Sequence, residues 1–212
     1  TTDPWFRPVD LQFGPDGALF IADFYNRIIG HYEVRLDHPG RDRKMGRIWR
    51  LVHDGSNAEP LPKPVNLHAA TLDQAIAELA SPLLARRMTA IDYLADDVGQ
   101  RAAEPLREAM ANPAVEPELK AHGAWVLQRL GQLDEATYSS LAKDESELVR
   151  VHTQRIAGDR KKWSPNIKSM VLAGLDDVSP QVRRAAADAL ARRSNPGYVR
   201  PLLAALGRTQ AL

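Results

Sequence analysis

Two hydrophobic periods divide the chain. Over residues 10–34, apolar and polar residues mostly alternate, which is typical of strands that bury one face. From Thr71 onward, apolar residues recur three or four positions apart, as at Met88, Ile91 and Leu94, so each segment can bury one face of a helix. The pattern predicts a short antiparallel β segment followed by a helical array, and therefore a mainly α protein.

β-branched and aromatic residues predict four short strands in the first segment. We place them at residues 9–13, 19–24, 28–34 and 47–52. In the first connection, Pro15 presets φ, the side chain of Asp16 can cap a turn, and Gly17 is free to take a positive φ. A short turn is expected at residues 25–27 and a long polar loop at 36–46, and loops of that length in compact units are often functional.

A proline-rich stretch separates the two patterns. Prolines 60, 62 and 64 block helix and central strand and favour extended backbone. We therefore assign residues 1–53 to the β segment, 54–70 to a linker and 71–212 to helical repeats.

The helical segments are expected in pairs. They are residues 72–79 with 82–95, 101–111 with 118–130, 135–142 with 147–157, 166–175 with 180–193, and a last helix near 198–206. The second helices end about 30 residues apart, a period typical of stacked helical repeats. Ser81-Pro82 and Ser179-Pro180 each place a capping hydroxyl before a proline at the first helical position.

Charge and composition exclude several classes of function. The 28 basic and 27 acidic side chains nearly cancel, so no global field attracts nucleic acid or anionic lipid. The absence of cysteine excludes disulfides, thiolate metal sites, iron–sulfur clusters and covalently attached haem. The start TTDPWFRP has neither the basic residues nor the apolar centre of a signal peptide, so we expect the chain to be an excised fragment. No catalytic or phosphate-binding motif is recognisable.

Two stretches resemble known families. SPQVRRAAADALARR and ESELVRVHTQRIAG resemble the second helices of HEAT repeats. DLQFGPDGALFIADFYNRIIGHYEV, followed by DHPGRDRKMGRIWRLV, resembles the end of the sugar-dehydrogenase-like β-propeller in large secreted proteins of planctomycetes and verrucomicrobia, described as membrane-bound dehydrogenases. In that family, HEAT repeats follow the propeller, and a c-type haem domain commonly comes next.

The resemblance implies a HEAT-like α–α superhelix preceded by one propeller blade. It also implies a periplasmic or extracellular parent that binds pyrroloquinoline quinone and c-type haem, with neither group held by this stretch alone. In the related quinoprotein glucose and sorbosone dehydrogenases, arginines ahead of this hairpin approach the quinone. Arg7 is the matching position here, and Trp5 stands at the second one. The alternative for Arg7 is a solvated side chain near a strand start.

A polar cluster follows the second predicted strand, at Asp23, Tyr25, Asn26, Arg27 and His31. These side chains could edge the channel of a propeller and contact a sugar, because hydroxyl-rich ligands need carboxylates, amides and rings. They could equally be turn residues whose side chains bond the nearby backbone, and we favour that interpretation.

The polar loop raises a second possibility at Asp37, His38 and Asp42. Oxygen and imidazole ligands within six residues could hold a divalent cation. Acidic loops that bind no ion are far commoner, so the loop is expected to be empty.

Arginines recur at the starts of the second helices: Arg86, Arg87, Arg150, Arg183 and Arg184. They could form a basic ridge for phosphate or an acidic partner. The balanced charge favours an internal ladder, with carboxylates such as Asp144, Asp176 or Asp177 as partners. Trp125 and Trp163 are expected to be packing anchors, and residues 160–162 a solvated loop. The last part of the array is locally basic, through Arg183, Arg184, Arg192, Arg193, Arg200 and Arg208.

Three functions remain open on the sequence. The chain could be the HEAT scaffold attached to a sugar-oxidising propeller, holding it to other domains of the parent or to a partner protein. It could be a pure protein-interaction scaffold with no redox role, or a HEAT-like nucleic-acid binder, which the charge distribution disfavours. In each case we expect the fragment alone to be inactive as an enzyme.

Overall fold

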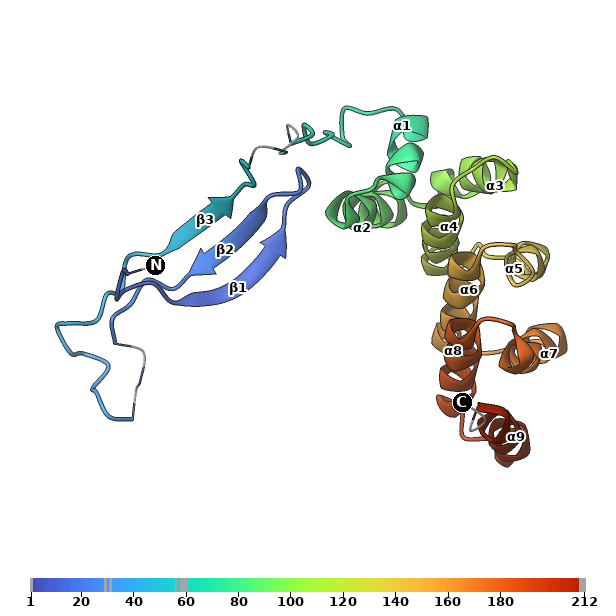
Figure 1. Ribbon diagram of the computed structural model, residues 1–212. Helices are drawn as coiled ribbons and strands as arrows, with labels where there is room; N and C mark the ends of the chain where they lie inside the picture. The colour runs from blue at the N-terminus through green and yellow to red at the C-terminus, as the bar shows by residue number, and fades with distance from the viewer. Residues whose placement is uncertain (1, 29, 31, 56, 58–60, 210–212) are drawn as a thin grey trace. The chain divides into compact units, whose positions relative to one another are not determined.

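The computed structural model is mainly α-helical, with a small antiparallel sheet at its N-terminal end (Figure 1). It describes residues 2–28, 30, 32–55, 57 and 61–209. The chain divides into two compact units: Thr1–Asn66 with Leu83–Arg86, and Leu67–Pro82 with Arg87–Leu212. Among the described residues, no helix combines the length and the apolar character needed to cross a bilayer.

The first unit contains a three-stranded sheet in the order β1-β2-β3, formed by β1 (Pro8–Phe13), β2 (Leu19–Asp23) and β3 (Arg47–Leu51). The turn between β1 and β2 forms as predicted: Gly17 has φ +84°, and the Asp16 carboxylate accepts the amide N–H of Ala18 at 3.0 Å. This turn and the pairing of Phe13 with Leu19 set the register of the hairpin.

The two faces of the sheet differ in polarity. Register places the row Leu11, Ile21 and Trp49 on one face, next to the row Phe13, Leu19 and Leu51. Along the two edge strands this apolar face is open, with Phe13 69% and Leu11 57% exposed. At one end of the same face, Asp23 lies opposite Arg47.

The third predicted strand, at residues 28–34, is wrong. Residues 28, 30 and 32–34 form no strand, and residues 29 and 31 lie outside the described residues. The reason lies in the backbone acceptors. The Arg41 guanidinium donates to the carbonyl oxygens of Ile28 (3.2 Å), Val34 (2.6 Å) and Gly30, so a side chain satisfies groups that a neighbouring strand would otherwise bond.

The helices of the second unit correspond closely to the predicted segments. They are α1 (Leu72–Ala77), α2 (Leu84–Asp92), α3 (Ala103–Ala111), α4 (Pro117–Arg129), α5 (Glu135–Leu141), α6 (Glu147–Asp159), α7 (Pro165–Ala173), α8 (Pro180–Ala191) and α9 (Val199–Thr209), with Leu84–Arg86 of α2 assigned to the first unit. A π-helical segment, Tyr93–Val98, continues α2.

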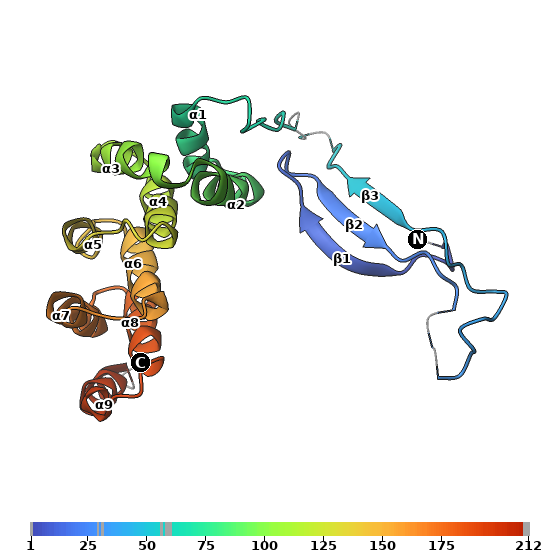
Figure 2. The same ribbon diagram turned by 180° about the vertical axis from the view of Figure 1, so that it is seen from behind.

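From α3 onward the helices form two layers. α4, α6 and α8 stack side by side in one layer, and α3, α5, α7 and α9 lie in the other (Figures 1 and 2). Each of α4, α6 and α8 also packs against the helix that precedes it, so the pairing expected from the sequence is present. The core between the layers holds fully buried side chains, among them Leu94, Leu106, Val126, Leu127, Tyr138, Val149, Ile156, Val171 and Leu190.

One of the two predicted serine caps is correct. Ser179 accepts the amide N–H groups of Gln181 (3.2 Å) and Val182 (3.3 Å), and Pro180 is the first residue of α8. At the other position, α2 begins at Leu84, two residues after Pro82, so Ser81-Pro82 precedes the helix rather than starting it.

Candidate functional site

Asp23, at the end of β2, organises the polar end of the sheet. Its carboxylate accepts N–H groups from the Arg7 backbone (2.8 Å), the Tyr25 backbone (2.9 Å), the Trp49 indole (3.0 Å) and the Arg47 guanidinium (3.1 Å). Burial of this carboxyl opposes its ionisation, but the hydrogen bonds and the Arg47 charge outweigh burial and lower the pKa of Asp23 to about 2. With four donors, the carboxylate has little capacity left for a ligand.

Arg47 completes this cluster from β3. Its guanidinium lies 3.6 Å from the centre of the Tyr25 ring and 4.9 Å from that of Trp49, and it pairs with Asp3 at 2.7 Å. The ring of Trp5 packs on Tyr25 with a centroid separation of 5.4 Å. Cation–π stacking and ion pairing therefore tie the N-terminal residues to the end of the sheet.

Of the other residues of the predicted channel edge, Tyr25 belongs to the cluster around Asp23 and Arg47, whereas Asn26 and Arg27 have separate environments. Tyr25 has φ +48°, a strained backbone for a residue with a side chain. Buried Asn26 donates to the Asp42 carbonyl at 2.7 Å and accepts the Ile28 amide at 3.2 Å, as a turn residue does. Arg27 is exposed, and His31 lies outside the described residues.

Arg7, the position that the resemblance implies for quinone contact, is held by its backbone. Its amide donates to Asp23, its carbonyl accepts the Phe24 amide at 2.9 Å, and its guanidinium donates to the Phe6 carbonyl at 2.8 Å. The residue as a whole is half-buried.

The cation hypothesis for the polar loop is not supported by the geometry. Asp37 pairs with Arg35 at 2.7 Å, His38 accepts the Gly40 amide at 3.0 Å, and Asp42 accepts the amides of Lys44 and Met45. Within the described ranges, no group of three or more ligating side chains could hold a metal ion.

In the second unit, the fourth residue of α2, α4, α6 and α8 is cationic in each case: Arg87, Lys120, Arg150 and Arg183. Each of the three arginines donates to the carbonyl six residues before it, over 2.5 Å for Arg87, 2.8 Å for Arg150 and 2.9 Å for Arg183. The equivalent position therefore closes the turn that leads into its own helix.

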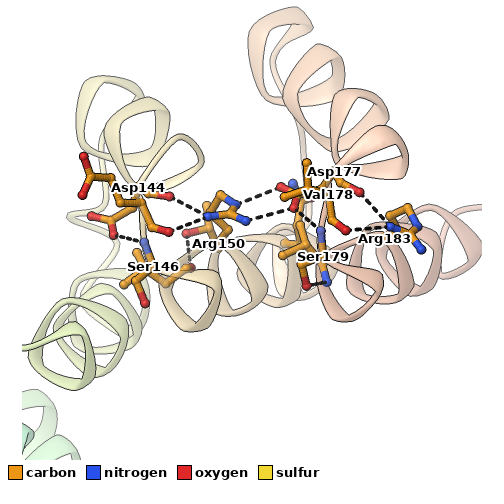
Figure 3. A network of polar contacts seen from close by, with 12 residues as sticks. Asp144, Ser146, Arg150, Asp177, Val178, Ser179 and Arg183 are labelled. Atoms are coloured by element: carbon orange, nitrogen blue, oxygen red, sulfur yellow. Dashed lines mark hydrogen bonds and ion pairs between the residues drawn. The ribbon is translucent and has the colours of Figure 1, made fainter.

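Two of these side chains, Lys120 and Arg150, also reach the following repeat, and Figure 3 shows the contact of Arg150 with Asp177. Lys120 pairs with Asp144 at 2.8 Å, and Arg150 makes a two-pronged contact with Asp177 at 2.8 and 3.0 Å. The Arg150 hydrogen bond lowers the pKa of Asp177, and the backbone amide of Ser179 also donates to that carboxylate. We define these two pairs as the ladder.

Arg183 and Arg184 differ from Arg150. The Arg183 guanidinium donates to the carbonyls of Asp177 and Val178, so it bonds to backbone oxygens rather than a carboxylate. Arg184 is exposed, makes no ladder pair, and lines the surface on both sides of α8, toward α6 and toward α9. Arg86 lies in the first unit, apart from the ladder.

Several residues expected to be solvated are instead engaged. Arg160 donates to Gln128 at 2.9 Å and to the Leu133 carbonyl, so the prediction of a solvated loop is wrong at this residue. Arg193, 33 positions later, donates to the carbonyls of Ala157 and Arg160 and lies 3.9 Å from the Trp163 ring centre. Both arginines contribute to packing between repeats rather than to an open basic surface.

A polar groove of about 430 Å³ lies between α6 and α8. Its walls carry both charges, from Glu147, Arg155, Arg184 and Asp188. His152, which also lines the groove, accepts the indole N–H of Trp125 at 2.8 Å, and burial together with the nearby Arg155 lowers its pKa to about 4. Neutral His152 is thus part of the packing between α4 and α6.

Sequence reasoning missed Arg47, Trp49, Lys120 and the loop-organising Arg41. Alternation within the predicted strands could have placed Asp23 and Arg47 on one face. A strand was also expected at residues 28–34, however, between them in the chain, so the direct pairing of β2 with β3 was not predicted. The repeated Asp-x-Ser at 144–146 and 177–179 was a visible signal for the ladder.

The fold defines a mainly α protein with an N-terminal antiparallel sheet. Residues 1–55 match a family described as a domain of unknown function, DUF7133. No curated protein matches the sequence.

Proposed function

We propose that the helical unit is a HEAT-like interaction scaffold, and that residues 1–53 form the end of a dehydrogenase-like propeller in a secreted parent. The observation that carries the scaffold role is the ladder. It pairs Lys120 and Arg150 with carboxylates inside the stack, and the mixed-charge groove between α6 and α8 stays open. A surface of this kind suits a protein partner better than a polyanion, because it presents both signs of charge.

The sheet supports the second half of the proposal. Its apolar face exposes Leu11, Phe13, Trp49 and Leu51 along the edge strands, and such a face is stable in water only when another layer covers it. A neighbouring propeller blade is a layer of this type. The match of residues 1–55 to one domain family agrees with treating this segment separately from the helices.

Site-specific cross-linking tests the scaffold role. A photoreactive phenylalanine derivative replaces Arg155 in the groove or, as a control, exposed Lys143 at the end of α5. We expect one discrete protein, or another domain of the same polypeptide, to be captured at position 155 and not at 143. Capture of nucleic acid, or equal capture at both positions, would contradict the proposal.

Dye reduction tests the redox half. With pyrroloquinoline quinone, calcium and glucose, residues 1–212 should give no turnover above a heat-inactivated control, since one blade cannot enclose a cofactor. A longer polypeptide that supplies the remaining blades should reduce the dye. If it does not, the alternative of a scaffold without a redox role stands.

A further inference from the structure

A second groove, of about 370 Å³, lies between α8 and α9. We call it the end groove. One wall is a single face of α8 with the i, i+3, i+4, i+7 spacing of a helix stripe, and the other comes from α9. The residues that line it are Pro180, Arg183, Arg184 and Ala187 of α8, Leu202, Ala205 and Leu206 of α9, and Leu175. It is mostly apolar, with two guanidinium groups at one side.

One repeat earlier, the corresponding face is covered. Arg183 and Ala187 of α8 correspond, 33 positions back, to Arg150 and Gln154 of α6. Gln154 is 2% exposed and lies so close to Gly174 that any side chain there would overlap its amide. The face of α6 is therefore buried by the next helix pair, whereas the same face of α8 lines a groove.

Arg183 also lacks the partner that its equivalent has. Arg150 donates to two backbone carbonyls and to the Asp177 carboxylate, whereas Arg183 donates to the carbonyls of Asp177 and Val178. Within the part of the chain that the structure describes, no carboxylate lies at ion-pair distance from Arg183. At the end groove, Arg183 therefore has no carboxylate in the position where Asp177 pairs with Arg150.

We propose that the end groove docks one further helix, preceded by an aspartate that lies two residues before a serine cap. The apolar face of that helix would fill the groove, and its aspartate would pair with Arg183 as Asp177 pairs with Arg150. This inference rests on the proposed scaffold role and specifies the chemistry of a partner. A second copy of this chain does not offer that chemistry at α2, because the residue two positions before Ser81 is Leu79.

Peptide binding tests the inference. A labelled peptide of residues 174–193, with blocked ends, carries Asp177, Ser179 and α8, and its binding to the whole chain is followed by fluorescence anisotropy. Two peptides are controls: the same peptide with Asp177→Asn, and residues 76–95, which place α2 and Ser81 in the same frame without the aspartate. We expect the first peptide to bind at least roughly tenfold more tightly than either control, as for a charge-assisted pair.

Variants of the protein locate the site. Ala187→Glu places a carboxylate inside the end groove, one helical turn from Arg183, where it disrupts the apolar contact and competes with the docking aspartate for the guanidinium, so it should abolish binding. A circular dichroism spectrum like that of the parent chain would show that the variant is still folded. Gln181→Glu adds the same charge on α8 outside the end groove and should bind normally.

Three results would overturn the inference: no binding of the first peptide at millimolar concentration, equal binding of all three peptides, or self-association of the chain that Ala187→Glu abolishes. The last would make a second copy the occupant. Since Arg155 lies in the other groove, cross-linking there would be unaffected if only this inference failed. If both peptide binding and cross-linking at position 155 failed, the proposed scaffold role would be contradicted as well.

Discussion

At the residue scale, arginines that make several hydrogen bonds within the chain stabilise the fold, whereas exposed arginines are available to other molecules. Arg150 is 14% exposed and bonds a carboxylate and two carbonyls, so its charge is neutralised inside the stack. Arg184, which directly follows Arg183, the equivalent of Arg150 in α8, is exposed. Position on the helix therefore decides which arginines are structural.

Removal of Arg150 should destabilise the helical unit. Arg150→Ala leaves the largely buried Asp177 carboxylate without its ion pair, so we expect a loss of about 1–3 kcal/mol in the free energy of unfolding. Arg183→Ala removes only bonds to carbonyls and should cost less, about 1 kcal/mol. Urea denaturation measures both, and Arg184→Ala is the control. A double-mutant cycle of Arg150→Ala with Asp177→Ala that shows no coupling would contradict the ladder.

His152 should make stability depend on pH. Its pKa is lowered to about 4 in the folded chain and is near 6.5 when unfolded, so protons bind the unfolded state preferentially between these values. The contribution of neutral His152 to the free energy of unfolding should therefore be fully present above about pH 6.5. It should fall by about 2–3 kcal/mol as the pH drops toward 4. His152→Gln should flatten this slope in denaturation at several pH values, while the exposed-residue control His53→Gln should not. An unchanged slope in His152→Gln would exclude this explanation.

At the element scale, the starts of the stacked helices are defined by two different devices. α8 begins with Ser179 capping the first amides and Pro180 in the first position. α6 begins after Ser146, whose side chain makes no capping bond to the helix, so the serine cap is present at α8 alone, whereas arginine contacts to the preceding turn are made at both helices, by Arg150 and by Arg183. Equivalent sequences therefore start equivalent helices through different local bonds.

This difference gives a matched pair of variants. Ser179→Ala removes a side-chain cap and should lower the free energy of unfolding by about 1 kcal/mol. Ser146→Ala removes the same hydroxyl at a position where it makes no capping bond. It should lower the free energy of unfolding by less than half of the loss in Ser179→Ala. Thermal unfolding followed by circular dichroism compares the two. Equal losses would mean that the cap bond at Ser179 contributes little.

The first unit shows how a strong local pattern can mislead. Residues 28–34 have the composition of a strand, but Arg41 occupies their carbonyls, and β2 pairs instead with β3 across a long connection. The strand propensity of residues 28–34 gives no information about Arg41, whose guanidinium binds the carbonyl of Ile28, thirteen residues earlier in the chain.

At the scale of the whole molecule, the balanced charge is distributed so that much of it is internal. At the basic end expected from the sequence, Arg183 and Arg193 bond backbone carbonyls, whereas Arg184, Arg192 and Arg200 remain exposed. The side chain of Arg208 lies outside the described residues. The guanidinium groups of Arg183 and Arg193 keep their positive charge, but the N–H groups that bond carbonyls are not available to phosphate oxygens.

We therefore expect no measurable DNA binding at physiological salt. Anisotropy of a labelled duplex should stay flat up to about 10 μM protein, a concentration within the range of about 1–100 μM in which ordinary non-specific dissociation constants lie. Arg184→Ala and Arg192→Ala should not alter this result. A micromolar complex that weakens steeply with salt, and that is lost in these variants, would favour the nucleic-acid alternative over the scaffold.

The sequence alone was sufficient for the helices of the second unit, their pairing, the Pro15-Asp16-Gly17 turn and the separation of β and helical patterns. Each of these follows from periodicity or from the backbone preferences of a few adjacent residues, which act over short distances along the chain.

Tertiary structure decided the rest. Whether Asp23 was a ligand or a structural acceptor depended on Arg47 and Trp49, which lie more than twenty residues away, and the sheet register brings them to its carboxylate. The sequence likewise showed that cations recur at helix starts, but only packing of the repeats pairs Arg150 with Asp177 and leaves Arg183 facing a groove. Charges and hydrogen bonds act across space, so their partners are determined by the fold and not by neighbouring residues in the chain.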